Sequence, residues 1–382
     1  MNWTPEDTTA LLDTVDRFAR DALVPHVNHW DAQATFPREL YRQAAHIGLL
    51  GLGYPEHLGG TPAPWRARNA VSQLLARRTA SGGLLASLFS HNIGLPPVLR
   101  HGPPELQQAV IPPVLRGEQI AALGITEPGA GSDVASLRTT ARRDGGDYVI
   151  DGEKVFITSG MRCDWISLAV RTDPEQKGAG GISMIAVPCD AKGIGRTPLQ
   201  KMGWHCSDTA HLRFDGVRVP ARNLLGREHQ GFRIVMGNFN GERLAMSALA
   251  LGFAEACHDE ALAWARERRT SGEALVERQV IRHKLMDMRM RIASTQAWLD
   301  QLGDRIDAGD EGPDWVGHVC LLKNHSTQAM QANADAAVQI LGGMGYMRGT
   351  ACERIYREVK VMMIGGGAEE IMKELAARQF GP

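Results

Sequence analysis

The chain has 382 residues, 43% of them hydrophobic, and a formal net charge of -1 at pH 7. This length exceeds what one compact unit usually needs, so we expect two or three subdomains. Because the chain creates no overall basic field, we expect neither nucleic acid nor an anionic membrane as its main partner.

The six cysteines include no CxxC pair, and no histidines stand at metal-ligand spacing. This pattern predicts buried thiols rather than a disulfide framework or a metal site. The first residues carry Glu6, Asp7 and Asp13 and lack the positively charged segment of a signal or transit peptide. No stretch approaches the roughly 20 apolar residues of a membrane span. We therefore expect a soluble cytoplasmic protein.

Residues 5–122 are predicted to form helices separated by proline and glycine. Leu11, Val15 and Phe18 have helical spacing, and similar periodicity recurs over residues 40–49 and 71–75. Breaks are expected at Gly59-Gly60, Pro96-Pro97 and Pro103-Pro104.

From about residue 123 to 232 the pattern changes to short runs typical of a β sheet. Strands are predicted over residues 148–150, 155–157, 165–170, 182–187 and 210–219. The predicted turns between them are Asp144 to Asp147, Asp151-Gly152, Gly178 to Gly181 and Asp215-Gly216.

The run TEPGAGSD, residues 126–133, is a candidate binding turn at the start of this region. Pro128 forces an extended or turn conformation on its predecessor, and Gly129 and Gly131 permit backbone geometries that a Cβ would block. Backbone N–H groups and the hydroxyls of Thr126 and Ser132 could then meet a planar polar ligand. The same composition also suits an ordinary turn.

From residue 239 onward the chain is again predicted to be helical, with long amphipathic segments over residues 244–265, 280–302 and 315–341. The order is therefore helical, strand-rich, helical. We expect domains over residues 1–122, 123–232 and 233–382.

Short motifs follow one another through the rest of the chain. They are Gly152-x-Lys154, Phe156-Ile157-Thr158, Asn223 to Gly226, Glu242-Arg243, Arg268-x-x-x-Gly272, Gln279, Leu285 to Met288, Gln339 to Tyr346, Arg354, Arg357 and IGGGAEEIM at 364–372.

In this order, and together with TEPGAGSD, the motifs resemble the acyl-CoA dehydrogenase family of flavoenzymes over essentially the whole chain. The resemblance implies an α+β fold with an N-terminal helical domain, a central β domain and a C-terminal four-helix bundle. It implies FAD as cofactor and a homotetramer or homodimer with shared sites.

The resemblance also implies roles for individual residues. Arg268, Gln279 and the segment from Gln339 to Gly343 match positions that reach the adenosine-diphosphate part of a neighbouring subunit's FAD, where an arginine supplies charge and paired donors. The implied flavin-binding residues are Leu123, Ile125, Thr126, Gly131, Ser132, Phe156, Ile157, Thr158, Arg268, Gln279, Gln339, Gly342, Gly343, Ala368 and Glu370, and the implied substrate-binding residues are Ser132, Asn240 and Arg243.

Three positions depart from the family pattern. Ser271 stands where a phenylalanine is usual, and Ala368 stands where a hydroxyl residue usually contacts the flavin. Gly366 occupies the position at which many members carry the catalytic glutamate. The missing side chain is expected to widen the pocket, while the backbone N–H of Gly366 can still polarise a thioester carbonyl.

Removal of an α proton requires a carboxylate. In the isovaleryl and long-chain members this glutamate stands at the start of the helix after the β domain, immediately before an arginine. Glu242, next to Arg243, matches that position. The alternative is a glutamate near a helix N-terminus, stabilised there by the helix dipole alone.

The predicted function is therefore FAD-dependent α,β-dehydrogenation of an acyl-CoA thioester, with electrons passed to an electron-transferring flavoprotein and a medium, long or branched acyl chain favoured. Alternatives are a flavin oxidase or monooxygenase on the same fold, an acyl-carrier-protein dehydrogenase, and a catalytically silent flavin- or acyl-binding protein. The last alternative is motivated by Ser271, Gly366 and Ala368.

Overall fold

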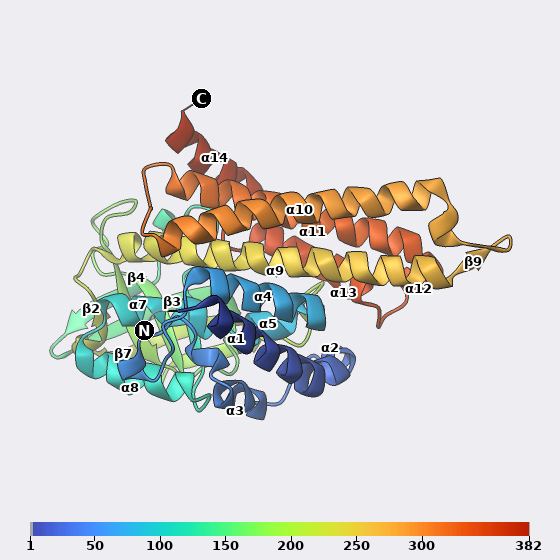
Figure 1. Ribbon diagram of the computed structural model, residues 1–382. Helices are drawn as coiled ribbons and strands as arrows, with labels where there is room; N and C mark the ends of the chain where they lie inside the picture. Colours follow the sequence, from blue (N-terminus) through green and yellow to red (C-terminus); the bar gives the residue numbers. More distant parts are fainter. Residues whose placement is uncertain (1–2, 382) are drawn as a thin grey trace.

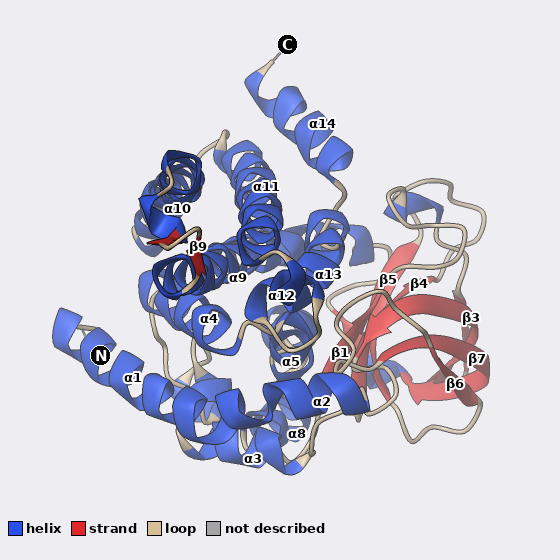
Figure 2. Ribbon diagram, turned by 90° about the vertical axis from the view of Figure 1, so that its right-hand side faces the viewer, coloured by secondary structure: helices blue, strands red, loops and turns tan. Residues whose placement is uncertain are grey.

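The computed structural model describes residues 3–381, so the predicted terminal domains are described without residues 1–2 and 382. Helices from both ends of the chain form one body, and a β sheet stands beside it (Figure 1). Seen after a quarter turn, the strands of the large sheet lie on one side and the long helices on the other (Figure 2). The predicted order of helical, strand-rich and helical segments is confirmed.

The N-terminal helices begin where the sequence supplies caps or prolines. Thr4 caps α1 and forms a reciprocal capping box with Asp7. Pro96 and Pro104 stand at the first positions of α7 and α8, where the missing N–H costs nothing. The helices are α1 (Pro5–Phe18), α2 (Val27–Gln33), α3 (Glu39–His46), α4 (Trp65–Thr79), α5 (Gly82–Leu88), α6 (His91–Gly94), α7 (Pro96–His101) and α8 (Pro104–Leu115).

The sheet runs in the order β6-β7-β3-β2-β4-β5-β8, and β1 pairs with β4 in parallel. Most neighbours are antiparallel, which suits its short connections. Its strands are β1 (Ala121–Gly124), β2 (Thr140–Asp144), β3 (Asp147–Thr158), β4 (Trp165–Arg171), β5 (Ile182–Pro188), β6 (Ile194–Pro198), β7 (Thr209–Pro220) and β8 (Leu224–Leu225).

Two predicted turns are wrong. Asp151-Gly152 lies inside β3 and Asp215-Gly216 lies inside β7, and the register between these strands shifts at that point. The N–H of Gly216 donates to Asp151 Oδ1 at 2.7 Å, and the two segments form a β-bulge. The Asp-Gly pairs that suggested turns belong to this bulge. The strand β6 was not predicted.

The C-terminal region contains α9 (Gly231–Glu267), α10 (Gln279–Asp307), α11 (Trp315–Leu341), α12 (Gly343–Tyr346), α13 (Ala351–Ile364) and α14 (Glu369–Phe380). The long helices α9, α10 and α11 run side by side and pack with α13 (Figures 1 and 2). A short hairpin, β9 (Arg269–Thr270) and β10 (Glu273–Ala274), joins α9 to α10.

The helix α9 begins at Gly231, well before the predicted start at Leu244. Three glycines lower the helix propensity of its first turns, which explains the wrong boundary. Two of them allow close packing. A Cβ on Gly231 would lie 2.4 Å from the backbone of Ser183 in β5, and one on Gly241 would lie 3.0 Å from the Trp65 ring. Tertiary packing therefore overrides local propensity here.

All six cysteines are buried free thiols. Between residues 3 and 381, no helix is long and apolar enough to cross a membrane. Within the same residues, no group of three or more histidine, cysteine or acidic side chains is placed to hold a metal ion.

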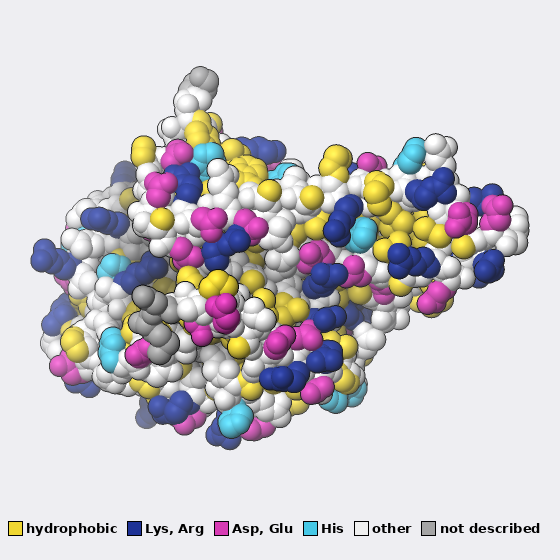
Figure 3. Space-filling view, viewed as in Figure 1, with side chains coloured by type: hydrophobic (Ala, Val, Ile, Leu, Met, Phe, Trp, Pro, Cys, Tyr) yellow, Lys and Arg dark blue, Asp and Glu magenta, His cyan; other side chains and the backbone are white. Residues whose placement is uncertain are grey.

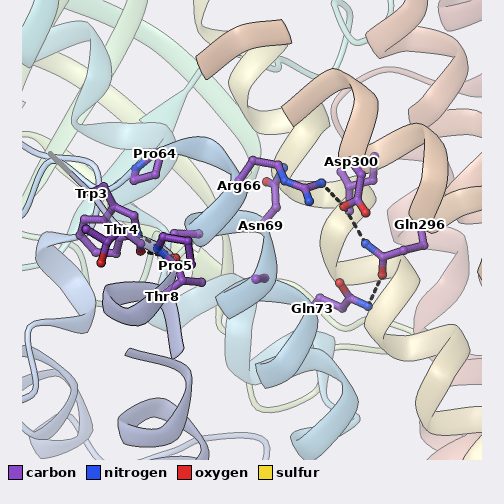
Figure 4. A pocket seen from close by; sticks show the side chains of 13 residues that line it. Trp3, Thr4, Pro5, Thr8, Pro64, Arg66, Asn69, Gln73, Gln296 and Asp300 are labelled. Atoms are coloured by element: carbon purple, nitrogen blue, oxygen red, sulfur yellow. Dashed lines mark hydrogen bonds and ion pairs between the residues drawn. The ribbon is translucent and has the colours of Figure 1, made fainter. Parts of the chain in front are cut away.

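A cavity of about 500 Å³ lies between α1, α4 and α10 (Figure 4). Its polar side is a chain of contacts in which Gln73 Nε2 donates to Gln296 Oε1 at 2.7 Å and Gln296 Nε2 donates to Asp300 Oδ1 at 2.8 Å. Arg66 completes it through an ion pair with Asp300. None of the predicted site residues lines this cavity, so the candidate site is built from their own contacts.

Candidate active site

The segment TEPGAGSD forms a tight turn directly after β1. The N–H of Glu127 donates to the carbonyl of Ala130 at 3.2 Å, and the N–H of Ala130 donates back to Glu127 at 3.0 Å. The carbonyl of Thr126 accepts from the N–H of Val155 at 2.8 Å. The turn is thereby held against β3, so two motifs that are far apart in sequence meet.

A buried ion pair between Lys154 and Glu127 holds this turn in place. Lys154 is fully buried, and its Nζ donates to Glu127 Oε1 at 2.7 Å and to the Ile125 carbonyl at 2.9 Å. The other donors to the Glu127 carboxylate are the N–H groups of Arg138 and Thr139. Burial lowers the pKa of Lys154 to about 8. Burial alone would raise the pKa of Glu127, but Lys154 and these donors hold it below its usual value. The pair is therefore hydrogen-bonded on both sides and fixes the turn.

Phe156 is an exposed aromatic side chain on strained backbone. Its side chain is 68% exposed although it lies within β3 between the half-buried Val155 and the buried Ile157. Its φ of +62° lies in the left-handed region, and the pairing of β3 with β7 shifts register between Lys154 and Ile157. Non-glycine residues in this region cost about 1–2 kcal/mol and cluster at ligand sites. Ile157 is buried beside it, and Thr158 is half-buried.

The exposed part of the turn is open. Gly131 and Ser132 are exposed, and a Cβ on Gly129 or Gly131 would meet nothing within 4 Å. Neither glycine has a left-handed φ, so the expected conformational need for glycine is absent. These glycines instead leave open space beside the backbone of the turn. Leu123 is half-buried in β1 and Ile125 is buried, so both lie under this surface.

Glu242 lies about three turns inside α9, and the expectation that it stands at the helix start is wrong, because the helix begins at Gly231. The helix dipole is felt only within the first turn and so has little influence here. The Oε2 atom of Glu242 is buried and has no hydrogen-bond partner within residues 3–381. Burial raises the pKa of Glu242 to about 7, while the charges of Arg243 and Lys323 lower it. A carboxylate with this pKa is suited to accept a proton near neutral pH.

Arg243 and Gly366 meet across the helix bundle. Arg243 is buried, and its Nε donates to the Gly366 carbonyl at 3.0 Å. Its NH1 donates to Asn240 Oδ1 at 3.3 Å, and its guanidinium carbon lies 5.4 Å from the centre of the Phe239 ring. Phe239 packs against the same hydrophobic cluster as Ile125. Helix α9, the glycine turn at residues 365–367 (the tail turn) and the segment that follows β1 are thus physically connected.

The tail turn is built from glycines in left-handed conformations. The φ angles of Gly366 and Gly367 are +66° and +112°. A Cβ on Gly366 would lie 2.9 Å from Met246 Sδ. Met246 therefore lies in the space that a side chain at position 366 would enter, and the expected widening of the pocket stays a prediction. Within residues 3–381 the Gly366 N–H has no hydrogen-bond acceptor.

Lys323 was missed by the sequence analysis. It is fully buried on α11, and its Nζ donates to the carbonyls of Met363 and Gly367, each at 2.8 Å. The available signal was its spacing, since Val319 and Met330 place it on the buried stripe of an amphipathic helix. A lysine on such a stripe is rare unless its ammonium group has partners.

The residues predicted to serve a neighbouring cofactor lie at the other end of the bundle. Arg268 ends α9 and is exposed, about 39 Å along the helix from Glu242. Gln279 is the exposed first residue of α10. Gln339, Gly342 and Gly343 are exposed where α11 ends. The hairpin of β9 and α12 both lie toward the right-hand end of the bundle in Figure 1. One chain therefore presents two separate sets of predicted site residues.

Two predicted flavin contacts stand at the start of α14. Ala368 is its N-cap residue and supplies no side-chain cap, and Glu370 is exposed in its first turn. Ser271 adopts a φ of +52° and, with Gly272, forms the two-residue turn between β9 and β10. The departure at Ser271 therefore lies in an exposed hairpin.

Comparison with known proteins gives matches along the whole chain. The family models for the N-terminal, middle and C-terminal domains of acyl-CoA dehydrogenase match residues 5–118, 122–217 and 229–381. Cyclohexane-1-carbonyl-CoA dehydrogenase of Geobacter metallireducens is 35% identical over 380 residues, covering 99% of this chain and 98% of that protein. The mitochondrial long-chain specific acyl-CoA dehydrogenase of Mus musculus is 34% identical, covering 96% and 85%.

Among solved structures, a probable acyl-CoA dehydrogenase from Mycobacterium abscessus superposes with a TM-score of 0.95 at 42% identity, covering 99% of each chain. Sequence, domain order and fold agree. The chain therefore belongs to the acyl-CoA dehydrogenase family, whose members are FAD-dependent oxidoreductases acting on CH–CH bonds.

Proposed function

We propose that this protein converts an acyl-CoA thioester to the trans-2-enoyl-CoA, with Glu242 as the catalytic base. The observation that carries this proposal is the buried, unpartnered Oε2 of Glu242, next in the chain to Arg243, which holds a turn that has no carboxylate at Gly366. A buried carboxylate without a hydrogen-bond partner is costly, so its presence calls for a functional reason.

FAD fits the surface formed by the 126–133 turn and β3. The exposed ring of Phe156 and the half-buried Leu123 offer apolar contact, and the free edge of the turn at Gly131 and Ser132 offers polar groups. A flat heterocycle with polar edges needs this combination. Thr126, Ile157 and Thr158 would complete the contacts. When bound, FAD supplies the acceptor for the hydride that leaves the β carbon.

In the proposed reaction, the ionised Glu242 accepts the α proton of the thioester. Its raised pKa makes the proton transfer favourable once the carboxylate is ionised. Negative charge then develops on the thioester oxygen. The free N–H of Gly366 would donate to that oxygen, and Arg243 holds the carbonyl of the same residue. Gly366 thus contributes through its backbone.

Ser132, Asn240 and Arg243 are the proposed substrate contacts. The buried Arg243 is already committed to Gly366 and Asn240, so its main task is to orient the turn that receives the thioester. A medium, long or branched acyl chain remains the favoured substrate, supported by the position of the base and by similarity to the long-chain relative.

We further propose that the functional unit is a homotetramer or homodimer and that electrons pass to an electron-transferring flavoprotein in the cytoplasm. Arg268, Gln279 and the segment from Gln339 to Gly343 are too far from Glu242 to serve the same flavin ring, which favours sites shared between copies. Hydrophobic side chains gather over the α10 end of the molecule in Figure 3. Exposed apolar residues there include Val280, Met286 and Met290 on α10 and Tyr346 on α12.

The test is anaerobic addition of a panel of acyl-CoAs to the FAD-loaded protein while flavin absorbance is followed. Bleaching by at least one acyl-CoA is expected. Glu242→Gln is expected to keep FAD and to lower the bleaching rate about 10³-fold. The matched control is Glu267→Gln, an exposed glutamate at the far end of the same helix, whose rate should not change.

Near wild-type bleaching by Glu242→Gln would show that the base is elsewhere. Failure of every acyl-CoA to bleach the wild-type flavin would reject the dehydrogenase and favour the silent binding protein. Rapid peroxide formation in air without an electron-transfer partner would favour the oxidase.

A further inference from the structure

Lys323 connects the bundle core to the two ends of the tail turn. The carbonyls that its Nζ contacts belong to Met363, in the last turn of α13, and to Gly367, just before α14. The segment between them consists of Ile364 and the glycines 365–366. Glycine is the most flexible residue and supplies no side chain to hold a turn in place. The shape of this segment therefore depends on contacts made to its carbonyls.

Buried cations provide those contacts. Arg243 holds the carbonyl of Gly366 from α9, while Lys323 holds those of Met363 and Gly367 from α11. With the carbonyls fixed on the side of the cations, the Gly366 N–H is left without an acceptor within residues 3–381. Charge-assisted hydrogen bonds to a backbone are stronger than neutral ones, so this arrangement can hold a flexible turn in one conformation.

The charge of Lys323 also acts on the carboxyl group of Glu242. The charged groups around its ammonium group are Glu242 and Arg243 on α9 and Glu369 on α14, with the Cys320 thiol on its own helix. Burial and Arg243 lower the pKa of Lys323 to about 8. Below that pH its charge acts on Glu242 and lowers the pKa of that carboxyl. The same ammonium group thus affects both the turn and the base.

We propose that Lys323 is a positioning residue that holds the 365–367 turn in one conformation through the carbonyls of Met363 and Gly367. The proposal rests on the proposed function for its catalytic part, while its structural part concerns the turn alone. It assigns a role to a residue that contacts neither substrate nor flavin in the proposed reaction.

The experiment compares Lys323→Met, Lys323→Arg and the wild type, with Lys373→Met as matched control because Lys373 is an exposed lysine on α14. The first readout is hydrogen exchange of the FAD-loaded protein. Lys323→Met should raise exchange about tenfold in peptides covering residues 360–372, with the rest of the protein unchanged. The second readout is the pH dependence of kcat/KM for the acyl-CoA that bleaches the flavin fastest.

In Lys323→Met, kcat should fall about 30-fold with a smaller change in KM, because the misplaced N–H is needed most in the transition state. The acid limb of kcat/KM should move to higher pH by about half a unit or more, since a charge that lowers the pKa of Glu242 is lost. Lys323→Arg should keep the acid limb near the wild-type value but recover kcat only in part, because its planar donors cannot reproduce the two contacts.

Unchanged exchange over residues 360–372 in Lys323→Met would overturn the positioning role even if turnover fell. Raised exchange throughout the protein would also overturn it, because a general structural role would then suffice. An unmoved acid limb would overturn the expected effect of the Lys323 charge on Glu242. If Lys323→Met does not fold, exchange in Lys323→Arg decides the same question. Wild-type protein that no acyl-CoA bleaches would reject the proposed function, whereas the exchange result would still decide whether Lys323 fixes the turn.

Discussion

Two glutamates, the half-buried Glu242 on α9 and the fully buried Glu358 on α13, have the same raised pKa of about 7 and very different partners. Burial is the largest cause in both. Glu358 is fully buried and accepts from the N–H groups of Gly82 and Gly83, at 2.7 and 3.4 Å, at the start of α5. Glu242 leaves its Oε2 without a partner within residues 3–381.

The difference teaches that a perturbed pKa does not by itself identify a catalytic group. Structural carboxylates are perturbed by the same burial. What separates the two is hydrogen bonding. The acceptor capacity of Glu358 is used by the backbone it holds, whereas Glu242 keeps an oxygen free to take a proton. The comparison therefore predicts opposite consequences for the same substitution at the two sites.

The largest expected effect is on activity. Glu242→Gln should lower the rate of flavin reduction about 10³-fold, while Glu358→Gln should leave it within about threefold, because Glu358 holds backbone away from the base. Stability should show the reverse. At pH 4.5, where the contribution of Glu358 is fully present, Glu358→Gln should lower the free energy of unfolding by about 2 kcal/mol, since one buried N–H loses its acceptor. Glu242→Gln should change it by less than about 1 kcal/mol.

Rapid-mixing absorbance at saturating acyl-CoA and urea unfolding with saturating FAD measure the two quantities. The expected difference between the two glutamates would be contradicted if Glu358→Gln lost activity as strongly as Glu242→Gln while remaining folded. Both carboxylates would then belong to the reaction.

The next largest expected effect is the pH dependence of the contribution that Glu358 makes to the free energy of unfolding. The folded-state pKa of Glu358 lies above its ordinary value of 4.5, so the folded protein binds this proton more tightly than the unfolded chain. The contribution of Glu358 to stability is therefore fully present below pH 4.5 and is lost as pH rises to about 7. The size of this loss is on the order of 3 kcal/mol.

Other groups oppose this trend, and His91 is one of them. Burial lowers its pKa to about 4, so its contribution to stability increases as pH rises from 4 toward 6.5. The measurement is therefore a difference: the unfolding free energy of wild type minus that of Glu358→Gln, followed between pH 4.5 and 8. This difference should fall as pH rises. A difference independent of pH would show that Glu358 titrates normally in the folded protein.

Much of this molecule could be predicted from sequence because its signals are local. The order of helices and strands follows from periodicity, and the motifs around Thr126, Phe156 and Glu242 stand out as short patterns. The proposal that Glu242 is the base needed only the family resemblance together with the glycine at position 366 and the glutamate at position 242. These inferences depend on residue types, which the sequence states directly.

What could not be predicted depends on close packing between distant segments. The first turns of α9 are helical because Gly231 and Gly241 allow approach to β5 and Trp65. The bulge at Asp151 and Gly216 requires both strands at once. Lys323 resembles any lysine until the carbonyls of Met363 and Gly367 are placed beside it.

The smallest expected effect concerns moving the base to the vacant position. Gly366→Glu added to Glu242→Gln places a carboxylate at the position where the family resemblance puts the glutamate of many members, yet it should leave the rate within about threefold of Glu242→Gln alone. The new Cβ would lie 2.9 Å from Met246 Sδ, and the left-handed φ of +66° adds strain. Adding Met246→Ala frees the space that the glutamate needs and should raise the rate about tenfold.

Met246→Ala alone is the control for the cavity that it creates, and the rate of flavin bleaching is measured for all four proteins. Equal recovery with and without Met246→Ala would mean that Met246 moves aside. Its packing would then not prevent a carboxylate at position 366 from acting. Recovery only in the triple variant would show that packing around Met246 now restricts the catalytic carboxylate to α9.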